Sequence, residues 1–314
     1  MDQVKKSRRT DRGGTFARTD LACESWDGSA GVVCREEKFE AGDVAVSVAK
    51  MEIVTRAAEQ RLGRRRGKYV TFASAHCFAE LDDASIGRLA DALGRELRDL
   101  CESACGRSAD SGFGVLVAGL GNADMTADAV GPMAAGMISA TRHLRDFDGG
   151  LYRALGCSAV SVVTPGVLGK TGIESAELLR GAVRAAHPDV VIAIDALAAR
   201  SCERLGRTIQ LSDSGIIPGS GVGNERKALT RSTLGVPVIS VGVPTVVDSS
   251  TLVWEALQKA NVGKNGEPAE LSESLRRVLE SGKSFFVSPR EADIITRQTA
   301  RVIASAIDGA FGIG

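Results

Sequence analysis

Short apolar runs alternate with amphipathic helical patterns along most of the 314-residue chain. The run at 189–197, "DVVIAIDAL", is rich in β-branched residues and carries no charge from Val190 to Ile194, which is typical of a buried strand. Other runs predict strands at 42–51, 68–74, 113–118, 158–163, 207–211 and 236–242. Helical periodicity covers 84–104, 129–144, 174–187, 249–260, 268–281 and 291–307. This alternation predicts a single α/β domain with a mostly parallel, twisted sheet covered by helices on both faces.

The first 20 residues do not share this pattern. They are polar, rich in Gly and Arg, and lack hydrophobic periodicity, so we expect a disordered extension at 1–20 and a folded domain at 21–314. The basic start is not followed by an apolar stretch, which argues against a secretory signal. The apolar windows are too short to span a bilayer. These features predict a cytoplasmic protein with no membrane contact.

Charge and cysteine content narrow the function classes further. The 39 basic residues balance 39 acidic ones and aromatic residues make up 4%, so nothing favours direct binding of nucleic acid. The seven cysteines form no C-x-x-C pair and are expected to be reduced thiols. Cys101 and Cys105, four residues apart, are the alternative: half of a metal site without further nearby ligands.

The stretch "GLGNADMTADAVGP" at 119–132 is a glycine turn between a predicted strand and a predicted helix. Such turns often hold a phosphate, but Asp124 and Asp128 would repel one, and Asn122 to Ala127 contains no further glycine of a dinucleotide fingerprint. "GVLGKTG" at 166–172 resembles the end of a P-loop, yet Thr164 stands where that loop needs its first glycine. A non-catalytic nucleotide-binding module therefore remains only as an alternative.

Two acids follow predicted buried strands. Asp128 lies in the turn after 113–118, and Asp195 lies at or near the carboxyl end of 189–197. Each alone is typical of a cap, but parallel strands bring their carboxyl ends to one sheet edge, where two meeting carboxyls do not both ionise. One can then activate water while the other protonates a leaving amine. Weaker candidates are Asp124, Asp213 and Asp248.

Other catalytic patterns are missing from the sequence. Of the three histidines, His76, His143 and His187, the second falls inside a predicted helix and the third ends one before Pro188, and each is expected to be a surface or core residue. The chain contains neither a G-x-S-x-G elbow nor an H-E-x-x-H motif. We therefore expect no metal site and no cofactor.

Several long blocks together resemble the germination protease family of endospore-forming bacteria. In chain order they are "RTDLACE", "GLGN" with "DAVGP", "TRHL", "TPGVLGKTGIES", "VIAIDALAARS", "SDSGIIPGSGVGN" and "GVPVISVGVPTVVD". The resemblance runs from about residue 18 to 260, with a weaker echo at 285–293. The chain departs from the family pattern at Ala127, where proline is common, and after residue 260, where it looks shortened.

The resemblance implies an endopeptidase that degrades small acid-soluble spore proteins at germination, located in the cytoplasm of the forespore and in the spore core. It implies a zymogen that removes its own N-terminal segment, a homotetramer, and an α/β fold shared with hydrogenase maturation proteases. The family's aspartate pair corresponds to Asp128 and Asp195, and Gly119, Gly121 and Asn122 would shape the turn that presents Asp128. "RTDLACE" predicts self-cleavage between Asp20 and Leu21. A hydrogenase-type maturation protease, which reads a metal with acids and a histidine, is the second alternative.

Overall fold

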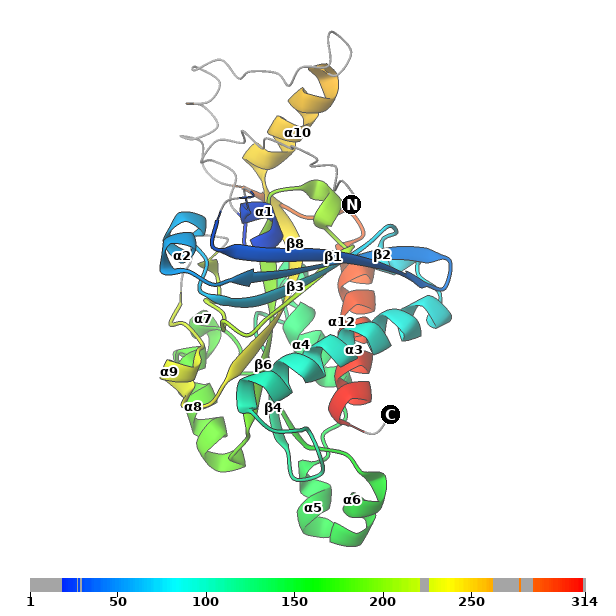
Figure 1. The fold of residues 1–314 in the computed structure, drawn as a ribbon, viewed down its shortest axis with the longest axis vertical. Helices are drawn as coiled ribbons and strands as arrows, with labels where there is room; N and C mark the ends of the chain where they lie inside the picture. The colour runs from blue at the N-terminus through cyan, green and yellow to red at the C-terminus, as the bar shows by residue number, and fades with distance from the viewer. Residues whose placement is uncertain are drawn as a thin grey trace.

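A computed structural model describes residues 19–26, 28, 30–220, 226–261, 277 and 285–312 (Figure 1). Its strands form one nine-stranded sheet in the order β1-β2-β3-β7-β8-β6-β4-β5, with β9 beside β8. The strands are β1 (Val32–Ala41), β2 (Val44–Ile53), β3 (Gly67–Ser74), β4 (Gly114–Gly119), β5 (Ala159–Val163), β6 (Val190–Ala199), β7 (Thr208–Ser212), β8 (Val238–Asp248) and β9 (Phe286–Val287).

The helices of the described chain connect and cover these strands. They are α1 (Ala22–Ser25), α2 (Arg56–Leu62), α3 (Asp83–Cys105), α4 (Val130–Met137), α5 (Arg142–Phe147), α6 (Gly149–Leu155), α7 (Leu168–Thr171), α8 (Ser175–Ala186), α9 (Arg231–Leu234), α10 (Ser249–Asn261) and α12 (Ala292–Phe311). Short 3₁₀ helices are η1 (Phe78–Glu80), η2 (Thr126–Asp128) and η3 (Cys202–Arg204). The expected α/β class is confirmed.

The sheet has two halves that differ in strand direction. Strands β8, β6, β4 and β5 pair with one another in parallel, as the alternation of strands and helices predicts. Strands β1, β2, β3 and β7 pair antiparallel, and β7 joins the two halves through an antiparallel pairing with β8. The parallel half carries the predicted acids, and the antiparallel half brings β7 alongside them.

Helices cover both faces of the parallel half (Figure 1). Ile192 and Ile194 of β6 pack into the main core with residues of α3, α4 and α12. Val191 and Ala193 alternate to the opposite face, where they pack with residues of α8 and α9. Burial on both faces explains why this strand contains almost no polar residues, and it makes the one charged residue, Asp195, conspicuous.

Some elements differ from the sequence expectation. The predicted helix at 129–144 is two helices, because the hydroxyl of Thr141 donates to the carbonyl of Ser158 at 2.6 Å and ties the break to β5. Strand β1 has no counterpart among the predicted strands because it is an exposed edge strand whose "REEKFE" segment lacks an apolar run. The helix expected at 268–281 lies outside the described residues except at Arg277.

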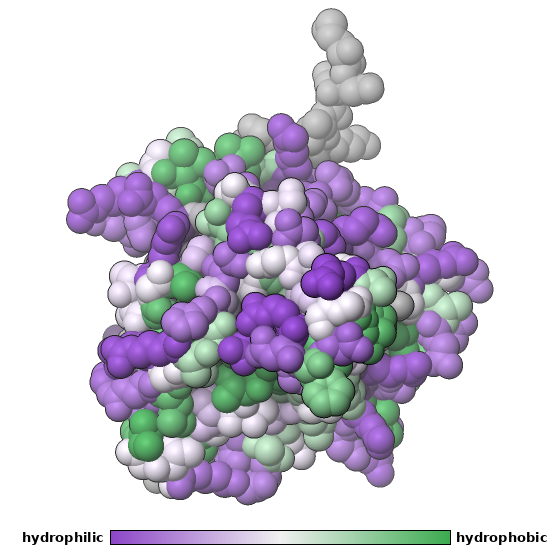
Figure 2. Space-filling model, turned by 90° about the horizontal axis from the view of Figure 1, so that it is seen from below, coloured by the Kyte–Doolittle hydropathy of each residue, from purple (hydrophilic) through white to green (hydrophobic). Residues whose placement is uncertain are grey.

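The surface mixes polar and apolar side chains. Phe147, at the end of α5, is 90% exposed. Figure 2, which views the molecule from below, shows apolar patches scattered among hydrophilic side chains. Within the described residues, none of the helices combines the length and the apolar character needed to cross a bilayer.

Candidate active site

Asp195 lies on β6 just beyond the end of β4. The β4–β6 pairing stops at Gly119 and Ile194, and the amide of Leu120 donates to the Ile194 carbonyl at 2.8 Å. Asp195 is therefore the first residue of β6 that is no longer flanked by β4, and its side chain is buried. Burial raises its pKa well above the usual range, and the nearby negative charge of Asp128 raises the pKa further. Both effects favour the protonated form of this carboxyl.

The glycine turn places Asp128 close to this strand end. Gly121 has φ +110°, and a Cβ at that position would lie 2.1 Å from the carbonyl oxygen of Asp128. Gly119 packs equally closely, since a Cβ there would lie 2.3 Å from the carbonyl oxygen of Gly131 in α4. The amide of Asn122 donates to Oδ2 of Asp128 at 2.7 Å. Gly121 and Asn122 thus lie against Asp128 itself, whereas Gly119 packs against α4, the helix that begins two residues after Asp128.

Asp128 ends η2, which is anchored from β8. The hydroxyl of Thr245 donates to the carbonyl of Ala127 at 2.6 Å. Partial burial raises the pKa of Asp128, and the hydrogen bond from the Asn122 amide lowers it in part. Two carboxyls with raised pKa values, close enough to interact, form a site that favours a single negative charge.

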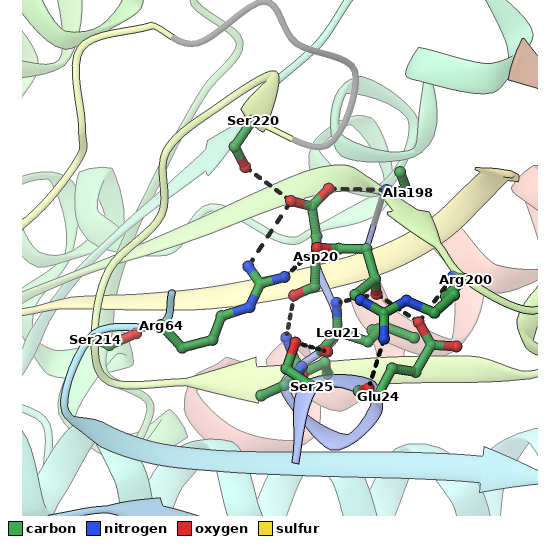
Figure 3. A network of polar contacts seen from close by, with 12 residues as sticks. Asp20, Leu21, Glu24, Ser25, Arg64, Ala198, Arg200, Ser214 and Ser220 are labelled. Atoms are coloured by element: carbon green, nitrogen blue, oxygen red, sulfur yellow. Dashed lines mark hydrogen bonds and ion pairs between the residues drawn. The ribbon is translucent and has the colours of Figure 1, made fainter. Parts of the chain in front are cut away.

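The N-terminal segment is docked on β6 near Asp195, whose pKa the charge of Asp20 also raises. Figure 3 shows the polar contacts of this segment. The amide of Asp20 donates to the Ala198 carbonyl at 2.8 Å, and the amide of Ala198 donates to Oδ2 of Asp20 at 2.9 Å. Leu21 is fully buried in a cluster with Leu197, Ala199 and Val247. Asp20, expected at the end of a disordered extension, is therefore held in place, because its carboxylate and backbone find partners on β6. Residues 1–18 lie outside the described chain.

Gln210 of β7 holds the peptide backbone on both sides of the Asp20–Leu21 bond. Its Nε2 donates to the Asp20 carbonyl oxygen at 3.4 Å, and its Oε1 accepts from the Ala22 amide at 2.7 Å. Gln210 and Asp195 both lie opposite Gly242 of β8, so the two side chains project to the same face of the sheet. The predicted cleavage bond thus lies on the face that carries Asp195.

The segment is also fixed at its C-terminal end. The carboxylate of Glu24 accepts from the Arg200 amide at 2.8 Å and lies 3.8 Å from Nε of Arg204. The hydroxyl of Thr19 donates to the same carboxylate. Residues 19–24, of which Ala22–Glu24 belong to helix α1, are therefore held by hydrogen bonds to β6, β7 and the chain after β6, and this binding surface is called the cleft below.

Comparison with known proteins identifies the family of the chain. A family model described as germination protease matches residues 18–260, which include the docked segment, both acids and Gln210. The chain belongs to the germination protease family. The chain is thus a member of a protease family, and the resemblance seen in the sequence is confirmed.

Individual germination proteases align over most of the chain. The protein of Caldanaerobacter subterraneus subsp. tengcongensis is 37% identical over 95% of this chain and 94% of its own length. The germination protease of Clostridium acetobutylicum is 35% identical over 93% and 94%, and that of Priestia megaterium is 37% identical over 85% and 73%. A solved [NiFe] hydrogenase maturation protease, HycI from Thermococcus kodakarensis KOD1, covers 62% of this chain and 94% of that chain with 18% identity. Its TM-score is 0.29, a value that supports no inference about individual residues.

The residues behind the alternative functions have other partners in the structure. Lys170, which suggested a P-loop, forms an ion pair with Asp124 of the glycine turn. His187 caps the C-terminus of α8, and His76 lies 3.6 Å from Glu80 in an exposed pair. No histidine is among the groups that shift the pKa of Asp128 or Asp195. Within the described residues, no three His, Cys, Asp or Glu side chains are grouped as metal ligands would be.

Of the remaining candidates, Asp213 and Asp248 have structural partners. Asp213 accepts from the Lys68 amide at 2.7 Å, and Asp248 accepts from the Ser250 amide at 2.8 Å. All seven cysteines are free thiols. The sequence analysis missed Gln210, because the predicted strand at 207–211 also contains Arg207 and Thr208 and a polar residue is not distinctive there.

Proposed function

We propose that the protein is a zymogen-activated endopeptidase that hydrolyses peptide bonds with the aspartate pair Asp128 and Asp195. The observation that supports this most directly is the docked segment, whose Asp20–Leu21 bond lies on the same face of the sheet as Asp195. Its backbone is held on both sides by Gln210. A bound peptide next to two interacting carboxyls is the arrangement that water-mediated hydrolysis requires.

In the proposed reaction the two acids have different protonation states. Asp195, the more deeply buried, carries the proton, and Asp128 is the carboxylate that removes a proton from the attacking water. The hydroxide adds to the carbonyl carbon of the residue before the bond, and Nε2 of Gln210 donates to the oxygen that becomes negative. The C–N bond then breaks while Asp195 gives its proton to the leaving nitrogen. The products are a carboxylate and an amine.

The same cleft explains how the intact chain is kept inactive. Residues 19–24 occupy the position that a protein substrate would take, so external substrates are excluded until the Asp20–Leu21 bond is cut. Cleavage would release residues 1–20 and free one half of the cleft. The family resemblance further supports small acid-soluble spore proteins as substrates, a homotetrameric assembly and a site of action in the spore core.

The experiment that tests this function is incubation of the purified chain with a small acid-soluble spore protein, with fragments identified by mass. We expect discrete cleavage, and none from the Asp195→Asn variant. Asp148→Asn is the matched control, because Asp148 is an exposed cap at the start of α6 and has no contact with the cleft. Absence of fragments from the wild-type chain, or equal cleavage by Asp195→Asn, would contradict the proposal.

A further inference from the structure

The carboxylate of Asp20 lies in a pocket made of hydrogen-bond donors (Figure 3). Ser220 donates to Oδ1 at 2.8 Å, and the Ala198 amide donates to Oδ2 at 2.9 Å. Nη1 of Arg64 forms an ion pair with Oδ1 at 3.9 Å, and Nη2 of Arg64 donates to the Thr19 carbonyl. Each carboxylate oxygen of Asp20 therefore accepts a hydrogen bond, and the guanidinium of Arg64 forms an ion pair with Oδ1.

These donors come from separate parts of the chain. Arg64 follows α2 in the antiparallel half, Ala198 belongs to β6, and Ser220 lies in the connection after β7. They converge on a residue that would leave with the released segment, not on a permanent part of the domain. Such convergence is the arrangement of a binding subsite for the residue before the cleaved bond.

We propose that Arg64 and Ser220 determine the specificity of cleavage by recognising a carboxylate on the residue immediately before the bond. The same pocket would accept the acidic side chain of a protein substrate once residues 1–20 have left. This inference rests on the proposed peptidase function, and it adds the residues that select the substrate.

The energetics of the empty pocket favour this role. The side chain of Arg64 is 19% exposed and that of Asp20 is 8% exposed, so the pair is largely shielded from water. When Asp20 leaves, the guanidinium loses its nearest counter-charge in the pocket. Its Nε already lacks an acceptor among the residues that the structure describes. A buried cation without a partner costs free energy, so a substrate with a neutral side chain at this position binds less well than one with a carboxylate.

The test is a double-mutant cycle in the full chain, with release of the N-terminal segment followed by intact mass. The four proteins are wild type, Asp20→Asn, Arg64→Gln and the double variant. Asparagine has nearly the shape of aspartate but no charge, so we expect Asp20→Asn to slow release about tenfold to a hundredfold. In the Arg64→Gln background, the same Asp20→Asn change should slow release by no more than about threefold. A general structural effect of Arg64→Gln would slow both chains of that background equally and leave their ratio unchanged.

Arg66→Gln is the matched control, since Arg66 is 58% exposed and pairs with Glu59 at 3.2 Å outside the pocket. In its background, Asp20→Asn should slow release as much as it does in wild type. If Arg64→Gln does not fold, the same double-mutant cycle with Ser220→Ala in its place tests the inference. In the Ser220→Ala background, Asp20→Asn should slow release several-fold less than it does in wild type.

The outcomes separate the inference from the function on which it rests. If wild type releases no segment at all, the proposed function falls and the inference falls with it. If wild type releases the segment but Asp20→Asn has the same effect with and without Arg64, the pocket does not determine specificity and the peptidase function stands. The inference is also overturned if the Asp20→Asn chain releases its N-terminal segment as fast as the wild-type chain does.

Discussion

Gln210 donates from Nε2 of its side chain to the carbonyl oxygen of Asp20 at 3.4 Å. The contact puts a neutral hydrogen-bond donor on the oxygen that gains negative charge when water attacks this carbonyl. The other end of the same amide accepts from Ala22 at 2.7 Å, which fixes the direction of the donor. Gln210 is therefore placed to orient the bond and to stabilise the charge that develops on it.

Replacing Gln210 by methionine should lower the rate of segment release about a hundredfold. Methionine has a similar volume but cannot donate a hydrogen bond. The substitution should therefore lower the rate constant of release and change the thermal midpoint of unfolding little. Thr208→Val, on the same strand, is the control. Thr208 is buried, and its hydroxyl has no partner among the described residues, so this variant should retain the wild-type rate. Equal rates for Gln210→Met and wild type would remove Gln210 from the mechanism.

Gly121→Ala should abolish cleavage and destabilise the fold by about 2–4 kcal/mol. Its φ of +110° is strained for alanine, and the added Cβ would lie 2.1 Å from the Asp128 carbonyl oxygen. Gly136→Ala in α4 is the matched control, because a Cβ there meets nothing within 4 Å. That change should be neutral or stabilise the helix by up to about 1 kcal/mol. Chemical denaturation and a cleavage assay check both variants, and an active, stable Gly121→Ala protein would contradict the role of the turn.

Asp195→Asn should raise the thermal midpoint at neutral pH. Because the folded state raises the pKa of Asp195, the folded chain keeps a proton that the unfolded chain loses as pH increases. The Asp195 carboxyl thus favours folding fully below the unfolded pKa of about 4, and this contribution is lost as pH rises toward the folded pKa. The asparagine variant does not titrate, so the difference in midpoint should be near zero at about pH 4 and grow with pH.

The midpoint of Asp195→Asn should exceed that of wild type by about 2–4 °C for each kcal/mol by which burial of the Asp195 carboxyl destabilises the wild-type fold. Calorimetry of both proteins at a series of pH values measures it. Asp148→Asn is the control and should change the midpoint little, because Asn caps a helix as well as Asp does. A difference for Asp195→Asn that is flat with pH would mean that burial does not perturb this carboxyl.

Asp128 and Asp195 could be predicted from the sequence because parallel strands bring their carboxyl ends to one edge of the sheet, and because Asp195 interrupts an apolar strand. The turn residues followed from the glycine pattern. Gln210, Arg64 and Ser220 were not accessible, because the position of Gln210 on β7, and of Arg64 and Ser220 in the connections beside β3 and β7, depends on antiparallel pairing that no local pattern encodes. The sequence predicts Asp20 at the end of a disordered extension, because the contacts that order it come from residues far along the chain, such as Ala198.

The most direct test of the aspartate mechanism is the N-terminus of the full chain after incubation at about pH 6, because mild acidity and raised pKa values both favour a pair that holds one proton. Wild type should yield a chain that begins at Leu21. Asp128→Asn and Asp195→Asn should each remain intact, with rates at least about a thousandfold lower. The account is contradicted if the wild-type chain begins at another residue, or if either asparagine variant releases residues 1–20 at close to the wild-type rate.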